Sequence, residues 1–86
     1  MPEISRFWGI VIRIYLNDHD PPHFHAAYAE WEAIFDIASL AILRGSLPRR
    51  AQSLVLEWAF LHRPELLQDW DLARSGGSPV PIAPLD

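Results

Sequence analysis

The chain contains no cysteine, no lysine and no long hydrophobic run. Without cysteine, neither a disulfide framework nor a thiolate metal site can form. No apolar run approaches the ~20 residues that a membrane-spanning helix needs. The first residues, MPEISRF, do not place an apolar stretch after a basic one, so we expect no signal peptide. We therefore expect a cytoplasmic protein without membrane contact, in keeping with a reducing compartment.

Positive charge is scarce as well. All seven basic side chains are arginines, and the formal net charge is −4. Binding to nucleic acid depends on a basic field that neutralises phosphates. The acidic balance therefore disfavours nucleic acid as a partner, although local arginine clusters remain able to bind anions.

The remaining composition indicates one small folded domain. Of the 86 residues, 50% are hydrophobic and four are tryptophan, enough for a core. A domain of this size buries a modest part of its surface, so its stability is marginal. Association with another chain commonly adds stability. We expect a homo-oligomer or a complex with a small protein partner.

Three segments have the alternation of β-strands. In GIVIRIYL (residues 9–16), Ile10, Ile12, Ile14 and Leu16 lie on one face, with Val11, Arg13 and Tyr15 on the other. NDHDPP (residues 17–22) is typical of a turn, and Pro22 favours an extended backbone before it. Strands are expected again from His23 and in residues 32–37, and a short fourth one in residues 40–43.

The period changes after residue 45. Ser46 or Leu47 is expected to cap a helix with Pro48 at its first position, and apolar residues then recur at helical spacing to His62. Pro64 should interrupt this helix, and a shorter one follows. We predict an α+β domain over residues 1–75: a three- or four-stranded antiparallel meander, then one long and one short helix packed on one face. Residues 76–86 form a Pro-rich C-terminal tail, extended or disordered.

The stretch NDHDPPHFH concentrates three of the four histidines beside two aspartates. His23 and His25 are two residues apart, so on a strand they project from the same face, away from the helices. They could share a divalent cation such as zinc, with His19, Asp18 or Asp20 as a further ligand. The alternative is a proline-stiffened turn on a solvated sheet face.

The sequence offers two other kinds of chemistry, one on the same sheet face and one at the start of the predicted helix. His23 and His25 could act as general acid and base, with Arg13 stabilising a phosphate, as in a ribonuclease-like site. Arg49 and Arg50 stand where the predicted helix begins, a position that the helix dipole makes unfavourable for cations. They could hold an anion or an acidic partner, or simply pair with nearby carboxylates.

Most of the chain resembles a bacterial family of uncharacterised proteins, domain of unknown function 4160. The resemblance runs from Ile4 to about Arg74 and is carried by SRFWGI, DHDPPHFH and the helical stretch LPRR…LEW. Genes of this family often lie beside another small domain in arrangements that look like toxin–antitoxin pairs. The resemblance therefore implies a protein partner.

Three functional hypotheses follow. The first is a cytoplasmic protein-interaction module, one half of a toxin–antitoxin-like pair, with residues 18–25 as its recognition or regulatory site. The second is a metal-dependent or metal-free phosphodiesterase acting on RNA through His23, His25 and Arg13. The third is a passive divalent-metal-binding protein.

Overall fold

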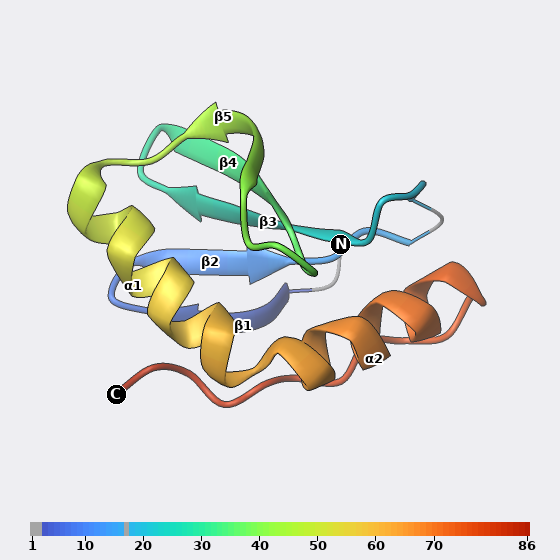
Figure 1. The fold of residues 1–86 in the computed structure, drawn as a ribbon. Coiled ribbons are helices and arrows are strands. Elements are labelled where there is room, and N and C mark those ends of the chain that lie inside the picture. The colour runs from blue at the N-terminus through green and yellow to red at the C-terminus, as the bar shows by residue number, and fades with distance from the viewer. Residues whose placement is uncertain (1–2, 17) are drawn as a thin grey trace.

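The computed structural model describes residues 3–16 and 18–86. Five strands precede two helices (Figure 1), in the order β1 (Glu3–Phe7), β2 (Ile10–Arg13), β3 (His23–Tyr28), β4 (Trp31–Asp36), β5 (Ile42–Ser46), α1 (Arg49–Leu61) and α2 (Arg63–Arg74). Each strand pairs antiparallel with the next, in the spatial order β1-β2-β3-β4-β5. The predicted α+β meander followed by two helices is confirmed, and the sheet has five strands rather than three or four.

Several boundaries differ from the predicted ones. β1 was not predicted, because Ile4 and Ser5 are both buried and the register shifts between Glu3 and Ser5, so its pattern does not alternate. β5 begins two residues later than expected and its residues are mostly exposed. The cap of α1 is Pro48, not Ser46 or Leu47. Asn17, where the predicted turn begins, lies outside the described residues.

The core fills the space between one face of the sheet and the helices. Ile10, Ile12 and Ile14 are fully buried, as their alternation predicts. Trp58 of α1 is buried among aromatic rings, with centroids 5.3 Å from Phe7 and 6.0 Å from Phe24. Aromatic pairs at such distances contribute about 0.5–1.5 kcal/mol beyond the burial of their area.

The chain turns between the helices at His62, where α1 ends and α2 begins, and Pro64 lies in the first turn of α2. Proline is tolerated there because the first helical N–H groups have no partner within the helix. The predicted interruption is therefore confirmed. α2 buries Leu66, Trp70 and Ala73. Among the described residues, no helix is long and apolar enough to cross a membrane.

The C-terminal tail is extended and runs back past both helices and β1 (Figure 1). Ile82 is buried in the core, and its N–H donates to the Ile4 carbonyl oxygen at 2.7 Å. The Trp58 indole N–H donates to the Ala83 carbonyl oxygen at 2.8 Å, and Asp69 of α2 accepts from the Val80 N–H at 2.8 Å. These contacts hold the tail along the edge of the sheet that β1 forms.

Candidate metal centre

The turn before β3 and the first residues of β3 bring the candidate ligands together. The Ile37 N–H donates to the Pro22 carbonyl oxygen at 3.0 Å, which continues the pairing of β3 and β4 by one step. His23 lies opposite Asp36, and His25 lies between Arg13 of β2 and Ile34 of β4. The backbone of both histidines is thus held within a sheet, and only the turn that carries Asp18 lies outside it.

Three side chains converge at this end of the sheet. Asp18 Oδ2 lies 2.8 Å from His23 Nε2 and 3.6 Å from His25 Nε2. One donor atom from each of Asp18, His23 and His25 lies within 4.8 Å of the others, and all three residues are buried or partly buried. These residues form the Asp-His-His cluster.

Hydrogen bonding fixes the proton on one ring nitrogen of His23. Nδ1 lies 2.7 Å from the Pro21 carbonyl oxygen, which can only accept, so Nδ1 carries a proton. Nε2 faces the Asp18 carboxylate at 2.8 Å. In a neutral imidazole Nε2 would then present its lone pair to a carboxylate oxygen, and the two would repel. A proton or a metal ion between Nε2 and Oδ2 would remove this repulsion.

His25 faces the cluster with a nitrogen that has no partner. Its Nε2 is buried and makes no hydrogen bond with the described residues. Its Nδ1 lies 3.4 Å from Glu32 Oε2, and its ring packs edge-on against Tyr15 with centroids 4.4 Å apart. An unsatisfied buried polar atom costs about 1–3 kcal/mol. A ligand on Nε2 would remove that cost.

The Asp18 carboxyl stays ionised at neutral pH. Burial works to raise its pKa, but hydrogen bonds from the His23 ring and the His19 N–H, together with the nearby His23 charge and His25, lower the pKa overall. The His19 N–H donates to Asp18 Oδ1 at 3.1 Å. Oδ2 is therefore the oxygen that points at the two histidines.

The donor set and its surroundings suit a divalent transition metal. A zinc ion about 2.0–2.1 Å from each donor brings neighbouring donor atoms to roughly 3–3.5 Å from each other. Imidazole and carboxylate donors suit zinc and other borderline ions. Ligating histidines usually donate their second N–H to a carbonyl or carboxylate oxygen, and the Pro21 oxygen and Glu32 stand in those places. The cluster could therefore hold a metal ion.

His19 and Asp20, the other predicted ligands, lie outside the cluster. Both are exposed, and Asp20 forms an ion pair with Arg74 of α2 at 3.0 Å. Arg13, the predicted phosphate-binding residue, neighbours His25 in the sheet register, but its side chain makes no hydrogen bond or ion pair among residues 3–16 and 18–86. The structure therefore separates Asp18 from its neighbours in the turn.

His23 does not lie on an open face as the alternation predicts. It is only 8% exposed, and its ring packs against Trp70 with centroids 5.0 Å apart. The prediction is wrong for His23 because α2 reaches the end of the sheet where β3 begins. Trp70 was missed as a neighbour of the cluster because nothing in the local pattern of α2 connects it to β3.

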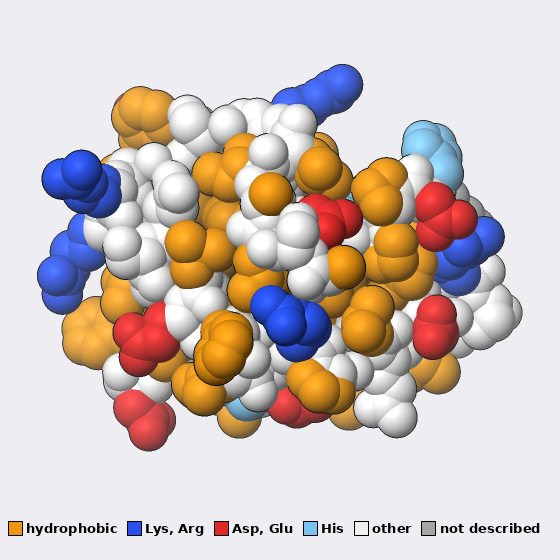
Figure 2. Space-filling model, in the orientation of Figure 1, with side chains coloured by type: hydrophobic (Ala, Val, Ile, Leu, Met, Phe, Trp, Pro, Cys, Tyr) orange, Lys and Arg blue, Asp and Glu red, His pale blue; other side chains and the backbone are white. Residues whose placement is uncertain are grey.

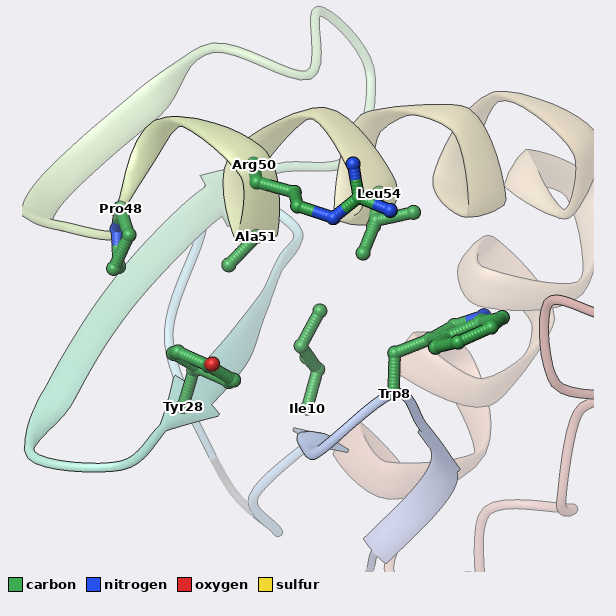
Figure 3. Close-up of a pocket in the computed structure, with 7 residues that line it drawn as sticks. All are labelled: Trp8, Ile10, Tyr28, Pro48, Arg50, Ala51 and Leu54. Carbon is green, nitrogen blue, oxygen red and sulfur yellow. The ribbon is translucent and has the colours of Figure 1, made fainter.

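Arg49 and Arg50, the predicted anion- or partner-binding residues, are exposed in the first turn of α1. Arg50 lines a cavity of about 240 Å³ between α1 and the sheet, and Arg49 does not. Figure 3 shows the other side chains around this cavity, among them Trp8, Ile10, Tyr28 and Leu54. No local pattern in the sequence indicates this cavity, because its walls come from three distant segments.

The fold and cluster together define a small α+β domain in which a five-stranded meander, covered by two helices, carries an Asp-His-His cluster at one end. Residues 9–71 match the family described as Domain of unknown function (DUF4160), and the chain belongs to that family. The predicted resemblance is therefore confirmed. No curated protein and no solved structure matches the chain.

Proposed function

We propose that the chain binds a divalent transition metal ion, with zinc as the best fit, at Asp18, His23 and His25. The observation that carries this proposal is the convergence of two imidazole Nε2 atoms on one carboxylate oxygen, at 2.8 and 3.6 Å. The unpartnered, buried Nε2 of His25 supports it. Three protein ligands leave at least one coordination position for water or for a group from a partner.

Binding of the ion should stabilise the fold, because the unfolded chain does not hold the three ligands together. A ligand at 100 times its dissociation constant adds about 2.7 kcal/mol to the free energy of unfolding. In a domain of this size that corresponds to a rise in melting temperature of roughly 10–20 °C. Thermal unfolding with and without Zn²⁺ at neutral pH, reversed by a chelator, measures this rise.

Two histidine variants make the test specific to the cluster. His25→Ala should abolish the Zn²⁺-dependent rise, since it removes the unpartnered donor. His19→Ala is the matched control, because His19 is exposed in the same turn and is not part of the cluster. Metal binding is contradicted if Zn²⁺, Ni²⁺ and Mn²⁺ all leave the melting temperature unchanged, or if His25→Ala keeps the full rise.

Protein interaction is the second candidate function. Large apolar side chains remain exposed, including Trp8 at 62%, Trp31 at 42% and Phe60 at 68%. Figure 2 shows hydrophobic side chains spread over much of the face on which the helices lie. Exposed aromatic residues are enriched at protein interfaces. They favour an interaction module, and the toxin–antitoxin-like partner stays a prediction.

The phosphodiesterase hypothesis has less support. A phosphate-stabilising cation should lie beside the two histidines, but the Arg13 side chain makes no hydrogen bond or ion pair with the cluster among the described residues. The positive side chain that does reach this turn, Arg74, pairs with Asp20.

A further inference from the structure

Figure 3 shows the cavity between α1 and the sheet. Ile10 and Tyr28, which line it, pair at the end of β2 and β3 opposite to Arg13 and His25, and so opposite to the cluster. Ile10 and Ala51 are buried on its two sides. The rest of its apolar lining is Trp8, Tyr28, Pro48 and Leu54. Arg50 is the charged residue that lines it, and none of its described lining residues is acidic. The cavity is thus an apolar hollow with one cationic side chain at its edge.

Its size limits what can enter. Pockets for drug-sized molecules and cofactors usually span about 300–1,000 Å³. At about 240 Å³ this cavity is smaller, and it suits one bulky side chain better than a complete cofactor. Tryptophan, tyrosine and arginine are also the residues enriched among those that dominate binding energy at protein interfaces. Trp8, Tyr28 and Arg50 supply one of each.

Trp8 and Tyr28, two of the residues that line the cavity, make contacts that restrict their side chains before anything binds. The Trp8 indole N–H donates to the Asp86 carbonyl oxygen at 3.3 Å. A methyl group at Gly9 would lie 3.3 Å from the Tyr28 ring, so the ring packs closely over the turn between β1 and β2. Rigid walls lower the entropy cost of binding.

Trp8 occupies a backbone position that does not suit it. Trp8 and Gly9 connect Phe7 to Ile10 in a two-residue hairpin turn, with φ angles of 52° and 82°. Asparagine followed by glycine is the preferred pair in such turns, because asparagine tolerates positive φ. A tryptophan here costs conformational energy and leaves its side chain 62% exposed. The role of the Trp8 side chain, rather than its backbone conformation, therefore explains why a tryptophan stands at this position.

The charge beside the cavity indicates which residues of a partner would flank an apolar side chain that enters it. The first turn of α1 contains Arg49 and Arg50, has no acidic residue and has no side-chain cap. The free N–H groups and positive dipole end of the helix add to the charge of the two arginines. In a chain of net charge −4, two of the seven arginines lie next to each other at this end of α1. An acidic segment fits it by charge complementarity.

We infer that the cavity receives a bulky apolar side chain from an acidic segment of a partner protein, with Arg50 contacting a carboxylate beside that side chain. This inference deepens the interaction function proposed above and names the class of its partner. It does not depend on the metal centre.

Three capped pentapeptides test the inference with the complete, ¹⁵N-labelled chain. One has phenylalanine between four acidic residues, the second has phenylalanine between four basic residues, and the third has alanine between four acidic residues. In NMR titrations the first peptide should shift the Trp8 indole signal and the amides of Tyr28 and Ala51. The other two should bind at least tenfold more weakly.

Three variants separate binding from folding. Trp8→Asn should keep or raise the melting temperature, because asparagine suits the turn, and should weaken peptide binding at least tenfold. Arg50→Gln should weaken binding of the acidic peptide several-fold and reduce its salt dependence. Arg49→Gln is the matched control in the same helical turn and should have a smaller effect, because Arg49 does not line the cavity.

Other results overturn the inference in recognisable ways. Shifts located on α2 or β5 would keep an interaction function but place it elsewhere. Equal binding of the basic peptide would contradict the acidic partner. Pocket signals that move with protein concentration alone would assign the cavity to a second copy of the chain. No shift with any peptide would contradict both the cavity as a docking site and its partner class.

Discussion

Gly45 shows how a single residue can fix the position of a strand. It lies in β5 opposite Ala33, with a φ of 79°. A Cβ atom there would lie 2.2 Å from the Glu32 carbonyl oxygen and 3.2 Å from the Ala33 Cα atom. Both neighbours are backbone atoms, which cannot move aside without disturbing β4. Residue 45 must therefore be glycine for two reasons, its φ angle and the closeness of β4.

The first prediction compares this glycine with another. Gly45→Ala should lower the free energy of unfolding by about 3 kcal/mol or more, because backbone strain is added to a steric clash. Gly76 has a similar φ of 85° but nothing within 4 Å of an added Cβ. Gly76→Ala should therefore cost only about 1 kcal/mol, the penalty of positive φ. Urea unfolding of both variants measures the difference, and equal losses would contradict this account of β5.

At the scale of elements, periodic patterns correctly predicted the strands and helices that bury one apolar face. Ile10, Ile12 and Ile14 alternate strictly, and β2 has its apolar face on the core as expected. The change to helical spacing placed α1 within a residue of its observed ends. β1 escaped prediction because the register shift breaks its alternation. β5 was misplaced because it is mostly exposed, and an exposed edge strand needs no apolar alternation.

The candidate site could be predicted only in part, because only its strand residues follow a periodic pattern. The spacing of His23 and His25 on one strand brought both to the cluster, as expected. Asp18, His19 and Asp20 were equal candidates in the sequence, because turn residues have no periodic direction. The Asp20–Arg74 ion pair and the His23–Trp70 contact join residues far apart in sequence. No local pattern encodes such contacts.

α2 and the tail are joined by a buried carboxylate. Asp69 is only 2% exposed; its Oδ1 accepts from the Val80 N–H, and its Oδ2 has no partner among the described residues. Burial raises the pKa of this carboxyl, the Val80 hydrogen bond opposes the rise, and the nearby Glu65 adds to it. The folded protein therefore holds the Asp69 proton more tightly than the unfolded chain does.

The second prediction follows from the sign of this shift. The stability that Asp69 contributes is complete below its ordinary pKa of 3.8 and is lost as pH rises through the raised value. Asp69→Asn cannot titrate, so wild type should lose stability relative to this variant as pH rises from 3.8. Urea unfolding of both proteins between pH 3 and 8 measures the difference. Asp71→Asn, exposed on the same helix, is the control and should show no such change; a matching change there would contradict the assignment.

At the scale of the whole molecule, the Asp-His-His cluster is connected to α2. The His23 ring packs against Trp70, which is itself part of the core. The turn that carries Asp18 is also tied to the end of α2 by the Asp20–Arg74 ion pair. That ion pair is exposed and contributes no more than about 1 kcal/mol. Binding of an ion at one end of the sheet should nevertheless stabilise the end of α2 through these two contacts.

The last prediction tests this connection by hydrogen exchange. With Zn²⁺ at 100 times its dissociation constant, any local opening that releases the ion becomes about 100-fold rarer. If the end of α2 opens together with the cluster, amides from Trp70 to Arg74 should exchange more slowly by up to that factor. Amides of β5, at the far edge of the sheet, should change less. Arg74→Gln should reduce the protection of α2 while leaving the affinity for Zn²⁺ nearly unchanged, because Arg74 is not a ligand. Protection confined to the turn and the start of β3 would show that α2 opens independently and that the ion acts only on its own ligands.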